Sequence, residues 1–421
     1  MIATSDSRAL VARWPDAWLL AGVRTPFVDF AQATSLVSPI DLGIKAAREA
    51  FTRTGISPDD VGTVIAGSMA QASFDAYLLP RHIGLYSGVP TQVPAHLVQR
   101  VCGTGIEVLS QAADTVSQQR ASLALCVGTE SMSRNPVAAY THRTGFRMGQ
   151  VEFKDFLWEA LLDTAVDATM GGTAEALAQR FDITREATDR FAARSFERAL
   201  VAQGDGFLEG EICALKDETF SVEGLKPRGI KLRSNGAAVA ADTHVRPSSV
   251  EQLAKLRPAF GGVQTAGNSS AIVDGAAAAL VGSADYARRG KLEPLARLVA
   301  CAAVGVHPGS MGLGPVDAIR AVLRETGLNL SAIDRVEINE AFAAQVLACV
   351  RELGLDETRL NVNGGAIALG HPLGATGIRL TVTLARELRR KRLRYGIASA
   401  CIGGGQGIAL LIENAAPGSP A

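Results

Sequence analysis

Two cysteines in this chain stand beside glycines, at positions where a sulfur atom could react. Cys102 lies in the segment VCGTG, where an extended run gives way to a predicted helix that begins near Gly103. The free N–H groups and the positive dipole end of a helix N-terminus favour a thiolate, which is the nucleophilic form of cysteine. A free cysteine is also a common small core residue, so Cys102 alone leaves a buried structural role open.

The second cysteine is Cys401, in the segment SACIGGGQG near the C-terminus. Its glycines either cradle a phosphate or let the backbone come close to a group that reacts at the sulfur. A dinucleotide-binding fingerprint needs glycines at its first, third and sixth positions, followed by a helix and a further strand. Counted from Gly403, the sixth position is Ile408, and only 14 residues follow Gly407. The sequence therefore disfavours a phosphate loop, while a strand with a glycine bulge stays open.

A histidine and an asparagine supply polar groups that could serve such a sulfur. His371 lies in LGHPLGATGIR, where the flanking glycines expose the imidazole at the start of a predicted helix. An imidazole titrates near neutral pH and can act as a base or as a hydrogen-bond donor. Asn339 and Glu340 lie between the apolar strand RVEI and the helix AFAAQVLACV. The structural alternatives are a turn histidine bonded to its own backbone and an ordinary helix N-cap.

Alternating strand and helix patterns must position these residues. Short apolar runs that end in small residues predict strands over 17–26, 61–69 and 121–131, with a helical pattern over 39–55. This alternation predicts an α/β fold with largely buried strands. From about Arg134 to His244 the chain is instead charged and helical, which predicts an insertion.

An internal repeat suggests that the α/β half is duplicated. The segments 102–116 and 373–388 each contain TGI at the start of a predicted helix, and each precedes a strand that ends in Cys-x-Gly. Two related halves packed together would place the matching helix N-termini face to face. Cys126 occupies the place of Cys401 in the first copy, but Thr-Glu follows its glycine instead of a glycine run. We therefore interpret Cys126 as structural.

The composition bounds the class of protein. The chain has 421 residues, 47% of them hydrophobic, which suits two or three domains around a large core. Lys and Arg together number 42, as do Asp and Glu, so nothing favours non-specific binding to nucleic acid or to an anionic membrane. No apolar run reaches the roughly 20 residues of a spanning helix, and no secretory signal is predicted.

The cysteine pattern favours a reducing compartment. Six cysteines, at positions 102, 126, 213, 301, 349 and 401, are scattered without a CxxC pair. This spacing argues against a zinc site and against a disulfide framework. We therefore expect free thiols and a cytoplasmic protein.

The segments VCGTG, NEAFA, GHPLGATG and CIGGGQG occur in this order, and with them the sequence resembles the thiolase family, which includes 3-ketoacyl-CoA thiolases and acetyl-CoA acetyltransferases. The resemblance runs from about Trp18 to Glu413 and also includes GTESMSRNP, MGGTAEALA, KLRPAF, TAGNSSAIVDGAAA and MGLGPVDA. It implies a duplicated, layered α/β/α/β/α fold with an inserted loop domain. The predicted domains are an N-terminal thiolase domain (18–134 with 249–288), a substrate-covering loop domain (135–248) and a C-terminal thiolase domain (289–421).

The resemblance also implies a role for each polar residue. Cys102 would be the acylated nucleophile, and Cys401 the acid/base that takes or returns the α-proton of the acetyl-CoA part. His371 would assist deprotonation of Cys102 and, with a water held by Asn339, bind the thioester oxygen. The backbone N–H groups of Cys102 and Gly403 would form a second oxyanion hole. The implied reaction is reversible cleavage of a 3-ketoacyl-CoA by CoA, or the reverse Claisen condensation, through a ping-pong acyl-enzyme.

For the CoA moiety, the resemblance points to Ser270 and Ala266 along the pantetheine arm. Leu161 and Arg246 would lie near the adenine and phosphate end, although a solvated charged face explains a single arginine equally well. The family takes CoA and acyl-CoA as substrates. We expect no permanently bound cofactor, no metal ion, and a homodimer or homotetramer.

The resemblance further implies that Met311 and Phe342 line the acyl pocket. Three residues of this sequence depart from the family pattern in segments expected near the substrate. Many relatives have Asn where this chain has Gln99. Acetoacetyl-type relatives often have His in place of Thr169, and Asn in place of Ala176. These changes bear on the preferred acyl chain length rather than on the reaction.

Two other functions are compatible with parts of this pattern. A decarboxylating condensing enzyme of the same fold would have a second histidine or an asparagine in place of Cys401, and it would release carbon dioxide from a malonyl thioester. A non-catalytic acyl-CoA binding protein would lack one of the four polar site residues and would gain no acetyl group on Cys102. All four residues are present, which favours the thiolase.

Overall fold

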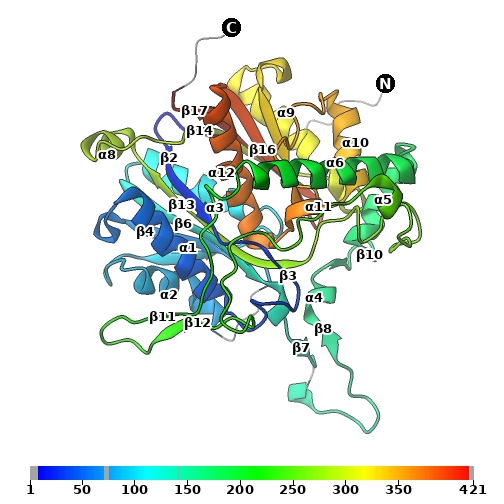
Figure 1. Cartoon of the computed structure of the whole chain (residues 1–421), viewed down its shortest axis with the longest axis horizontal. Coiled ribbons are helices and arrows are strands. Elements are labelled where there is room, and N and C mark those ends of the chain that lie inside the picture. The colour runs from blue at the N-terminus through cyan, green and yellow to red at the C-terminus, as the bar shows by residue number, and fades with distance from the viewer. Residues whose placement is uncertain (1–7, 71–74, 141, 417–421) are drawn as a thin grey trace.

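The central feature of the fold is a sheet built from both halves of the chain. The computed structural model describes residues 8–70, 75–140 and 142–416 (Figure 1). The main strands pair in the order β15-β16-β17-β14-β2-β13-β6-β4-β5. The N-terminal half contributes β2 (Trp18–Arg24), β4 (Thr63–Gly67), β5 (Ala95–Val98), β6 (Leu123–Ser131) and β13 (Val273–Gly282). The C-terminal half contributes β14 (Ala296–Gly305), β15 (Arg335–Ile338), β16 (Tyr395–Ile402) and β17 (Gln406–Asn414).

Short strands extend both halves of this sheet. The strand β1 (Leu10–Arg13) pairs with β14, and β3 (Val28–Asp29) pairs with β13. The two halves are joined where β14 pairs with β2 through only two residue pairs, Ala296 with Leu19 and Arg297 with Trp18.

The two halves have the same strand order and direction. In the N-terminal half, β4 pairs in parallel with β5 and β6, and β13 pairs antiparallel with β6 and β2. In the C-terminal half, β15 pairs in parallel with β16, and β17 pairs antiparallel with β16 and β14. A parallel bridge between Val336 and Leu360 takes the place of β5. This topology confirms the duplication predicted from the repeated TGI and Cys-x-Gly segments.

Helices cover both outer faces of the sheet and fill the space between the halves. The helices α1 (Pro39–Thr54) and α2 (Leu79–Tyr86) form one outer core with the N-terminal strands. The helices α9 (Gly314–Thr326) and α10 (Ala343–Leu353) form the other. Between them, α3 (Thr104–Ser117) and α12 (Leu373–Lys391) pack together in a middle layer that contacts strands of both halves. The predicted α/β/α/β/α layering is confirmed.

The middle helices cross where each carries a glycine of its TGI segment. A Cβ atom on Gly105 would lie 2.6 Å from the backbone nitrogen of Ile378, and one on Gly377 would lie 2.2 Å from that of Ile106. Only glycine leaves room for this approach. The helix N-termini therefore lie face to face, as the internal repeat predicted.

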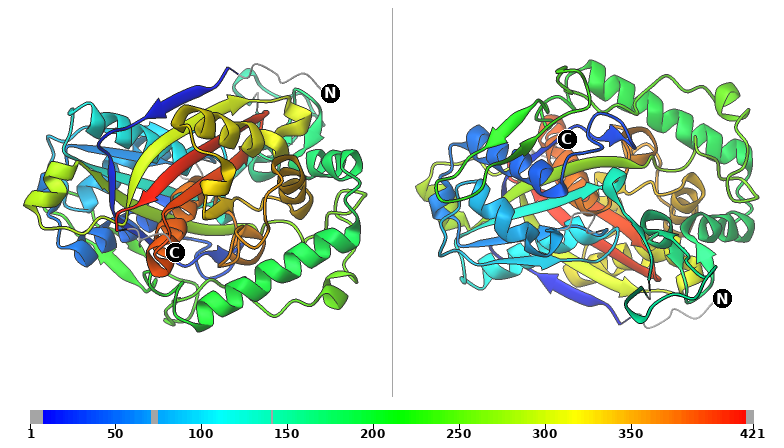
Figure 2. Two further views of the ribbon diagram at one scale, coloured as in Figure 1. Left: turned by 90° about the horizontal axis from the view of Figure 1, so that it is seen from above. Right: turned by 90° about the horizontal axis from the view of Figure 1, so that it is seen from below.

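The region between β6 and β13 wraps around both halves. Its helix α6 (Arg185–Gly204) packs on α11 (Ala366–Leu369) and α10 of the C-terminal half, and it runs along the outside of the molecule in both views of Figure 2. Its other strands and α-helices are β7 (Val137–Ala138), β8 (Lys154–Asp155), α4 (Phe156–Glu159), β9 (Leu162–Asp163), β10 (Ala168–Thr169), α5 (Met170–Arg180), β11 (Glu218–Phe220), β12 (Arg228–Ile230) and α7 (Val250–Leu253). The helix α8 (Ala284–Arg289) follows β13. The three domain boundaries placed at 135, 249 and 289 stay predictions.

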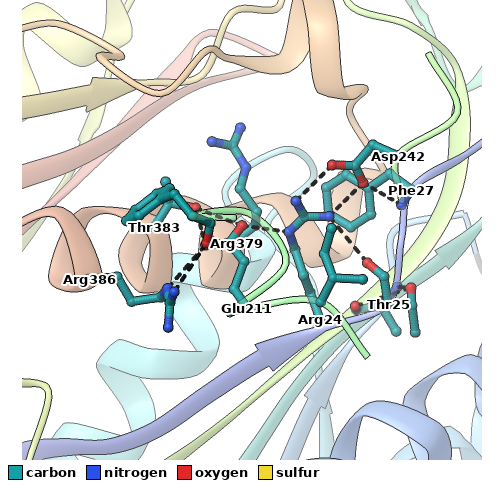
Figure 3. Close-up of polar contacts among 12 residues, drawn as sticks. Arg24, Thr25, Phe27, Glu211, Asp242, Arg379, Thr383 and Arg386 are labelled. Atoms are coloured by element: carbon teal, nitrogen blue, oxygen red, sulfur yellow. Dashed lines mark hydrogen bonds and ion pairs between the residues drawn. The ribbon is translucent and has the colours of Figure 1, made fainter. Parts of the chain in front are cut away.

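A buried ion-pair network fastens this inserted region to the rest of the molecule (Figure 3). The guanidinium of Arg24, on β2, donates from Nη1 and Nη2 to the carboxylate of Asp242 at 2.6 and 2.8 Å, and from Nε to Glu211 at 2.7 Å. Glu211 also accepts from the hydroxyl of Thr383 on α12. The network thus joins the insertion to a strand of one half and a helix of the other.

Two features of the described residues bear on the predicted partners. Over the described part of the chain, no helix has the length and apolar character needed to cross a bilayer. Within the same residues, no three His, Cys, Asp or Glu side chains are grouped to hold a metal ion.

We predict that Arg24→Met lowers the free energy of unfolding by about 3–5 kcal/mol, because it leaves the buried Asp242 without a cation and Glu211 with only Arg386, 4.0 Å away. Urea denaturation measures the change. The control is Arg190→Met, which removes the exposed pair with Glu186 and should cost less than about 1 kcal/mol. Equal losses in the two variants would contradict a fastening role for the buried network.

Candidate active site

A cavity of about 490 Å³ receives residues from both halves and from the insertion. Cys102, His371 and Cys401 all contribute to its wall. The remaining lining is mainly apolar and comprises Asp29, Phe30, Met132, Trp158, Leu161, Thr169, Met170, Gly171, His244, Ala259, Phe260, Thr265, Ala266, Ser269, Ser270, Ala271, Ile272, Met311, Ala341, Phe342 and Leu373. The structure therefore brings the two predicted reactive sulfurs and the predicted imidazole into one chamber.

Cys102 sits on a strained turn at the N-terminus of α3. Val101 has φ of 45°, which a β-branched residue rarely adopts. The hydroxyl of Thr104 holds this turn, because it accepts from the N–H of Arg100 and donates to the carbonyl of Val101. Gly103 is the N-cap, and a Cβ atom there would lie 2.5 Å from Cδ1 of Ile402. The turn thus places the sulfur against the end of β16.

The glycines after Cys401 form the turn of the β16–β17 hairpin, in which Ile402 pairs with Gln406. Gly404 and Gly405 have φ of 83° and 82°, and a Cβ atom on Gly405 would lie 2.3 Å from the carbonyl oxygen of Val306. This turn directs the N–H of Gly403 at the sulfur of Cys102, toward which the N–H of Cys102 itself also points. The run is a tight turn that carries an amide into the site, not a phosphate loop.

His371 is buried and held through both ring nitrogens. Nδ1 lies 2.6 Å from the hydroxyl oxygen of Thr376, and that hydroxyl lies 3.2 Å from the carbonyl oxygen of Pro372. When the hydroxyl donates to this carbonyl, it accepts from Nδ1–H, which leaves a lone pair on Nε2. The side-chain nitrogen of Asn339 lies 3.2 Å from Nε2. Asn339 is fully buried, and its side-chain oxygen accepts no hydrogen bond from the described residues.

The other predicted contacts divide into two groups. The cavity is lined by Ser270, Ala266, Leu161, Met311 and Phe342. Met311 and Phe342 form one apolar cluster with Cys401.

Arg246, by contrast, is exposed and does not contribute to the cavity wall. Its guanidinium stacks on Phe196 and donates to the carbonyl of His244, which does line the cavity. Of the departures from the family pattern, Thr169 lines the cavity, whereas Gln99 and Ala176 are exposed.

The sequence matches two family models along most of its length. The thiolase N-terminal domain matches residues 18–285, and the thiolase C-terminal domain matches residues 292–414. The chain belongs to the thiolase family. It is 41% identical to the mitochondrial 3-ketoacyl-CoA thiolase of Bos taurus over 95% of this chain and 98% of that protein. It is 40% identical to the acetyl-CoA acetyltransferase of Pseudomonas aeruginosa over 94% and 99% of the two chains.

The fold agrees with this assignment. The crystal structure of human mitochondrial 3-ketoacyl-CoA thiolase in complex with CoA superimposes with a TM-score of 0.89, at 39% identity, over 95% of this chain and 98% of that chain. This thiolase is therefore an acyltransferase, and its reaction is CoA-dependent thiolytic cleavage or the reverse condensation.

The pKa values in this thiolase correct one prediction from the sequence. Burial raises the pKa of the Cys102 thiol to about 11, against the hydrogen bonds from the N–H groups of Gly403 and Cys102, which lower it. Burial also raises the pKa of Cys401 well above its usual range. The expectation that the helix N-terminus favours a thiolate at Cys102 is wrong, because desolvation outweighs the local dipoles.

The imidazole is also neutral in this environment. Burial, with a smaller contribution from the charge of Arg379, lowers the pKa of His371 to about 3. At neutral pH the site thus contains a thiol and a neutral imidazole rather than a thiolate–imidazolium pair.

Sequence reasoning missed several residues of the cavity wall. Phe260 and Met132 line the cavity and lie inside the family segments KLRPAF and GTESMSRNP. These segments could therefore have indicated both residues. The pair of Asp29 and His244, with 2.7 Å between Oδ1 and Nδ1, lines the cavity from segments that are far apart in the chain. No local pattern predicts that pair.

We predict that the free enzyme contains no Cys102 thiolate at pH 7, because the pKa of the thiol lies near 11. Thiolate absorbance near 240 nm, measured as the difference between the wild type and Cys102→Ser, should rise only in strongly alkaline solution. Difference absorbance that is already complete below pH 7 would show a thiolate–imidazolium pair instead.

Proposed function

We propose that this thiolase transfers acyl groups through a thioester on Cys102, with His371 as the base for that sulfur and Cys401 as the acid/base at the α-carbon of acetyl-CoA. The observation that carries this proposal is the shared cavity, whose wall includes all three side chains although they lie far apart in the chain. A soft sulfur nucleophile suits the reaction, because it attacks a carbonyl and later leaves to another thiol.

The first half-reaction uses the neutral thiol–imidazole pair. As the sulfur of Cys102 attacks the 3-keto carbon, its proton passes to the lone pair on Nε2 of His371, in place of the hydrogen bond from the side-chain nitrogen of Asn339. The bond between the second and third carbons breaks, and the acetyl-CoA enolate that leaves takes a proton from Cys401. The raised pKa of Cys401 keeps this proton in place until the enolate forms. The thiol of CoA then gives its proton to the Cys401 thiolate as it attacks the acyl-enzyme. The Cys102 sulfur that leaves takes back the proton held by His371, which restores the free enzyme.

Two sets of donors stabilise negative charge on oxygen during these steps. The N–H groups of Cys102 and Gly403 converge near the sulfur, where the oxygen of the tetrahedral intermediate would develop. One such donor is worth about 3 kcal/mol in rate. The side chain of Asn339 beside His371 supports a second oxyanion site, and its side-chain oxygen suits a water molecule that completes that site.

The cavity wall supports the assignment of CoA and acyl contacts. Ser270 and Ala266 offer a hydroxyl and a small side chain to the pantetheine arm, with Leu161 on the same wall. Met311 and Phe342 surround Cys401 and would hold the acyl group that reacts there. Arg246 lies outside the cavity, where it could meet only a phosphate or adenine group that projects beyond the entrance.

We predict that Cys401→Ala still gains one acetyl group on Cys102 from acetyl-CoA but loses about 10²–10⁴-fold in turnover, because proton transfer at the α-carbon is missing. Mass spectrometry of the intact protein and of its peptides measures the first result, and a thiolysis assay the second.

The matched controls are the other cysteines. Cys102→Ser should gain no acetyl group, and Cys126→Ser should behave as the wild type, since Cys126 is a buried strand residue outside the cavity. Acetylation that persists in Cys102→Ser would assign the nucleophile to another residue.

We also propose a homo-oligomer in a reducing, cytoplasmic compartment. The terminal strand β5 has a second edge that pairs with no strand of the described chain, and such edges tend to pair with another copy. All six cysteines are free thiols.

Light scattering should give the mass of a dimer or tetramer. Leu97→Pro, on β5, should shift the oligomeric state toward the monomer, because it removes one N–H from that strand. A monomer of the wild type at micromolar concentration would contradict this proposal.

A further inference from the structure

A buried carboxylate joins the two halves next to the catalytic residues. Glu130 lies at the end of β6, is fully buried, and accepts four hydrogen bonds. Three come from the segment after β4: the hydroxyl of Ser68 at 2.9 Å, the N–H of Met69 at 2.9 Å and the N–H of Ala70 at 3.0 Å. The fourth comes from the N–H of Gly374 at 3.0 Å, in the first turn of α12. No cationic side chain of the described residues forms an ion pair with this carboxylate.

The first turn of α12 rests directly on the strands that carry Glu130. A Cβ atom on Gly374 would lie 2.8 Å from the carbonyl oxygen of Thr129 and 3.0 Å from that of Gly67. A Cβ atom on Gly128 would lie 2.1 Å from the carbonyl oxygen of Gly374. His371 stands three residues before Gly374, so any shift of this turn moves the imidazole relative to Cys102, which belongs to the other half.

The duplication gives this contact a counterpart in the catalytic half. When the two TGI segments are aligned, Gly374 occupies the position of Cys102. When the two Cys-x-Gly segments that follow are aligned, Gly128 occupies the position of Gly403. At Cys102, the backbone N–H points toward the reacting sulfur, where an oxyanion would develop. At Gly374, the corresponding N–H is bonded to the carboxylate of Glu130. Free N–H groups at a helix N-terminus favour an anion in both places.

We propose that Glu130 is a positioning residue that docks the first turn of α12 onto the N-terminal half and so holds His371 over Cys102. Its carboxylate occupies, in the second half of the duplicated fold, the place that the substrate oxyanion takes in the first. The inference rests on the proposed function, because it assumes that His371 serves the sulfur of Cys102. Glu130 does not touch the reacting atoms and acts only through the position of α12.

The geometry defines an informative substitution, Glu130→Gln. Each carboxylate oxygen accepts two hydrogen bonds, so a glutamine amide must turn its –NH₂ toward two donors in either orientation. The matched control is Asp274→Asn. Asp274 is equally buried, but its hydrogen-bond donors belong to Thr34, Met132 and Ser133, all within the N-terminal half.

The experiment measures the single-turnover rate of Cys102 acetylation at saturating acetyl-CoA, together with the concentration for half-saturation and the melting temperature. For Glu130→Gln we expect the saturating rate to fall about 100-fold with half-saturation changed by less than about threefold, because a displacement near 1 Å has this effect on an aligned reaction. Asp274→Asn should lower the melting temperature by as much as Glu130→Gln does, but its saturating rate should equal that of the wild type.

Two results would overturn the inference. One is a saturating rate in Glu130→Gln equal to that in Asp274→Asn. The other is a faster rate than in the wild type, which would show that Glu130 acts only as a charge that disfavours the thiolate. If Glu130→Gln does not fold, Ser68→Ala removes one donor and should slow acetylation about fivefold; an unchanged rate in that variant also overturns the inference. Failure of the wild type to be acetylated would instead overturn the proposed function.

Discussion

The close crossing of α3 and α12 is the constraint on which the active site depends. Gly105 and Gly377 let the two backbones touch, and a Cβ atom on either glycine would lie within 2.6 Å of a backbone nitrogen of the other helix. This contact places the N-terminus of α3, with Cys102, beside the N-terminus of α12, with His371. Cys401 reaches the same chamber because its strand, β16, ends against Gly103. Side-chain packing alone would leave the helices several ångströms farther apart.

Much of this arrangement could be predicted from the sequence because the determinants are local. The TGI and Cys-x-Gly segments repeat, so the duplication and the facing helix ends follow from short patterns. The glycine run after Cys401 predicts a tight backbone turn. The alternative, a dinucleotide-binding loop, is disfavoured by the spacing of the glycines alone. Ser270 and Ala266, by contrast, were expected from the resemblance to the thiolase family, and both line the cavity.

What the sequence could not predict depends on burial and on long-range contacts. The pKa of Cys102 is raised because protein surrounds its sulfur, and this burial is not visible in the sequence. The position at a helix N-terminus, taken alone, indicates a lowered pKa. The position of Arg246 outside the cavity depends on its stacking with Phe196, which no spacing reveals. Glu130 is visible in GTESMSRNP, but its partners at 68–70 and 374 lie far away in the chain.

Two buried charged residues near the site, Glu130 and Arg379, favour its neutral form. The carboxylate of Glu130 lies at the N-terminus of α12, the end whose dipole favours negative charge, and Arg379 is buried about one and a half turns farther along the helix. Glu130 raises the pKa of Cys102, and Arg379 lowers the pKa of His371, so each adds to the effect of burial. An ion pair in the empty site would therefore be opposed from both sides. The charge that develops during acyl transfer is instead met by backbone N–H groups, which stabilise an oxyanion without making the resting sulfur a thiolate. A sulfur kept as a thiol in the free enzyme is also less open to oxidation, so the arrangement separates reactivity toward the bound substrate from reactivity toward solvent oxidants.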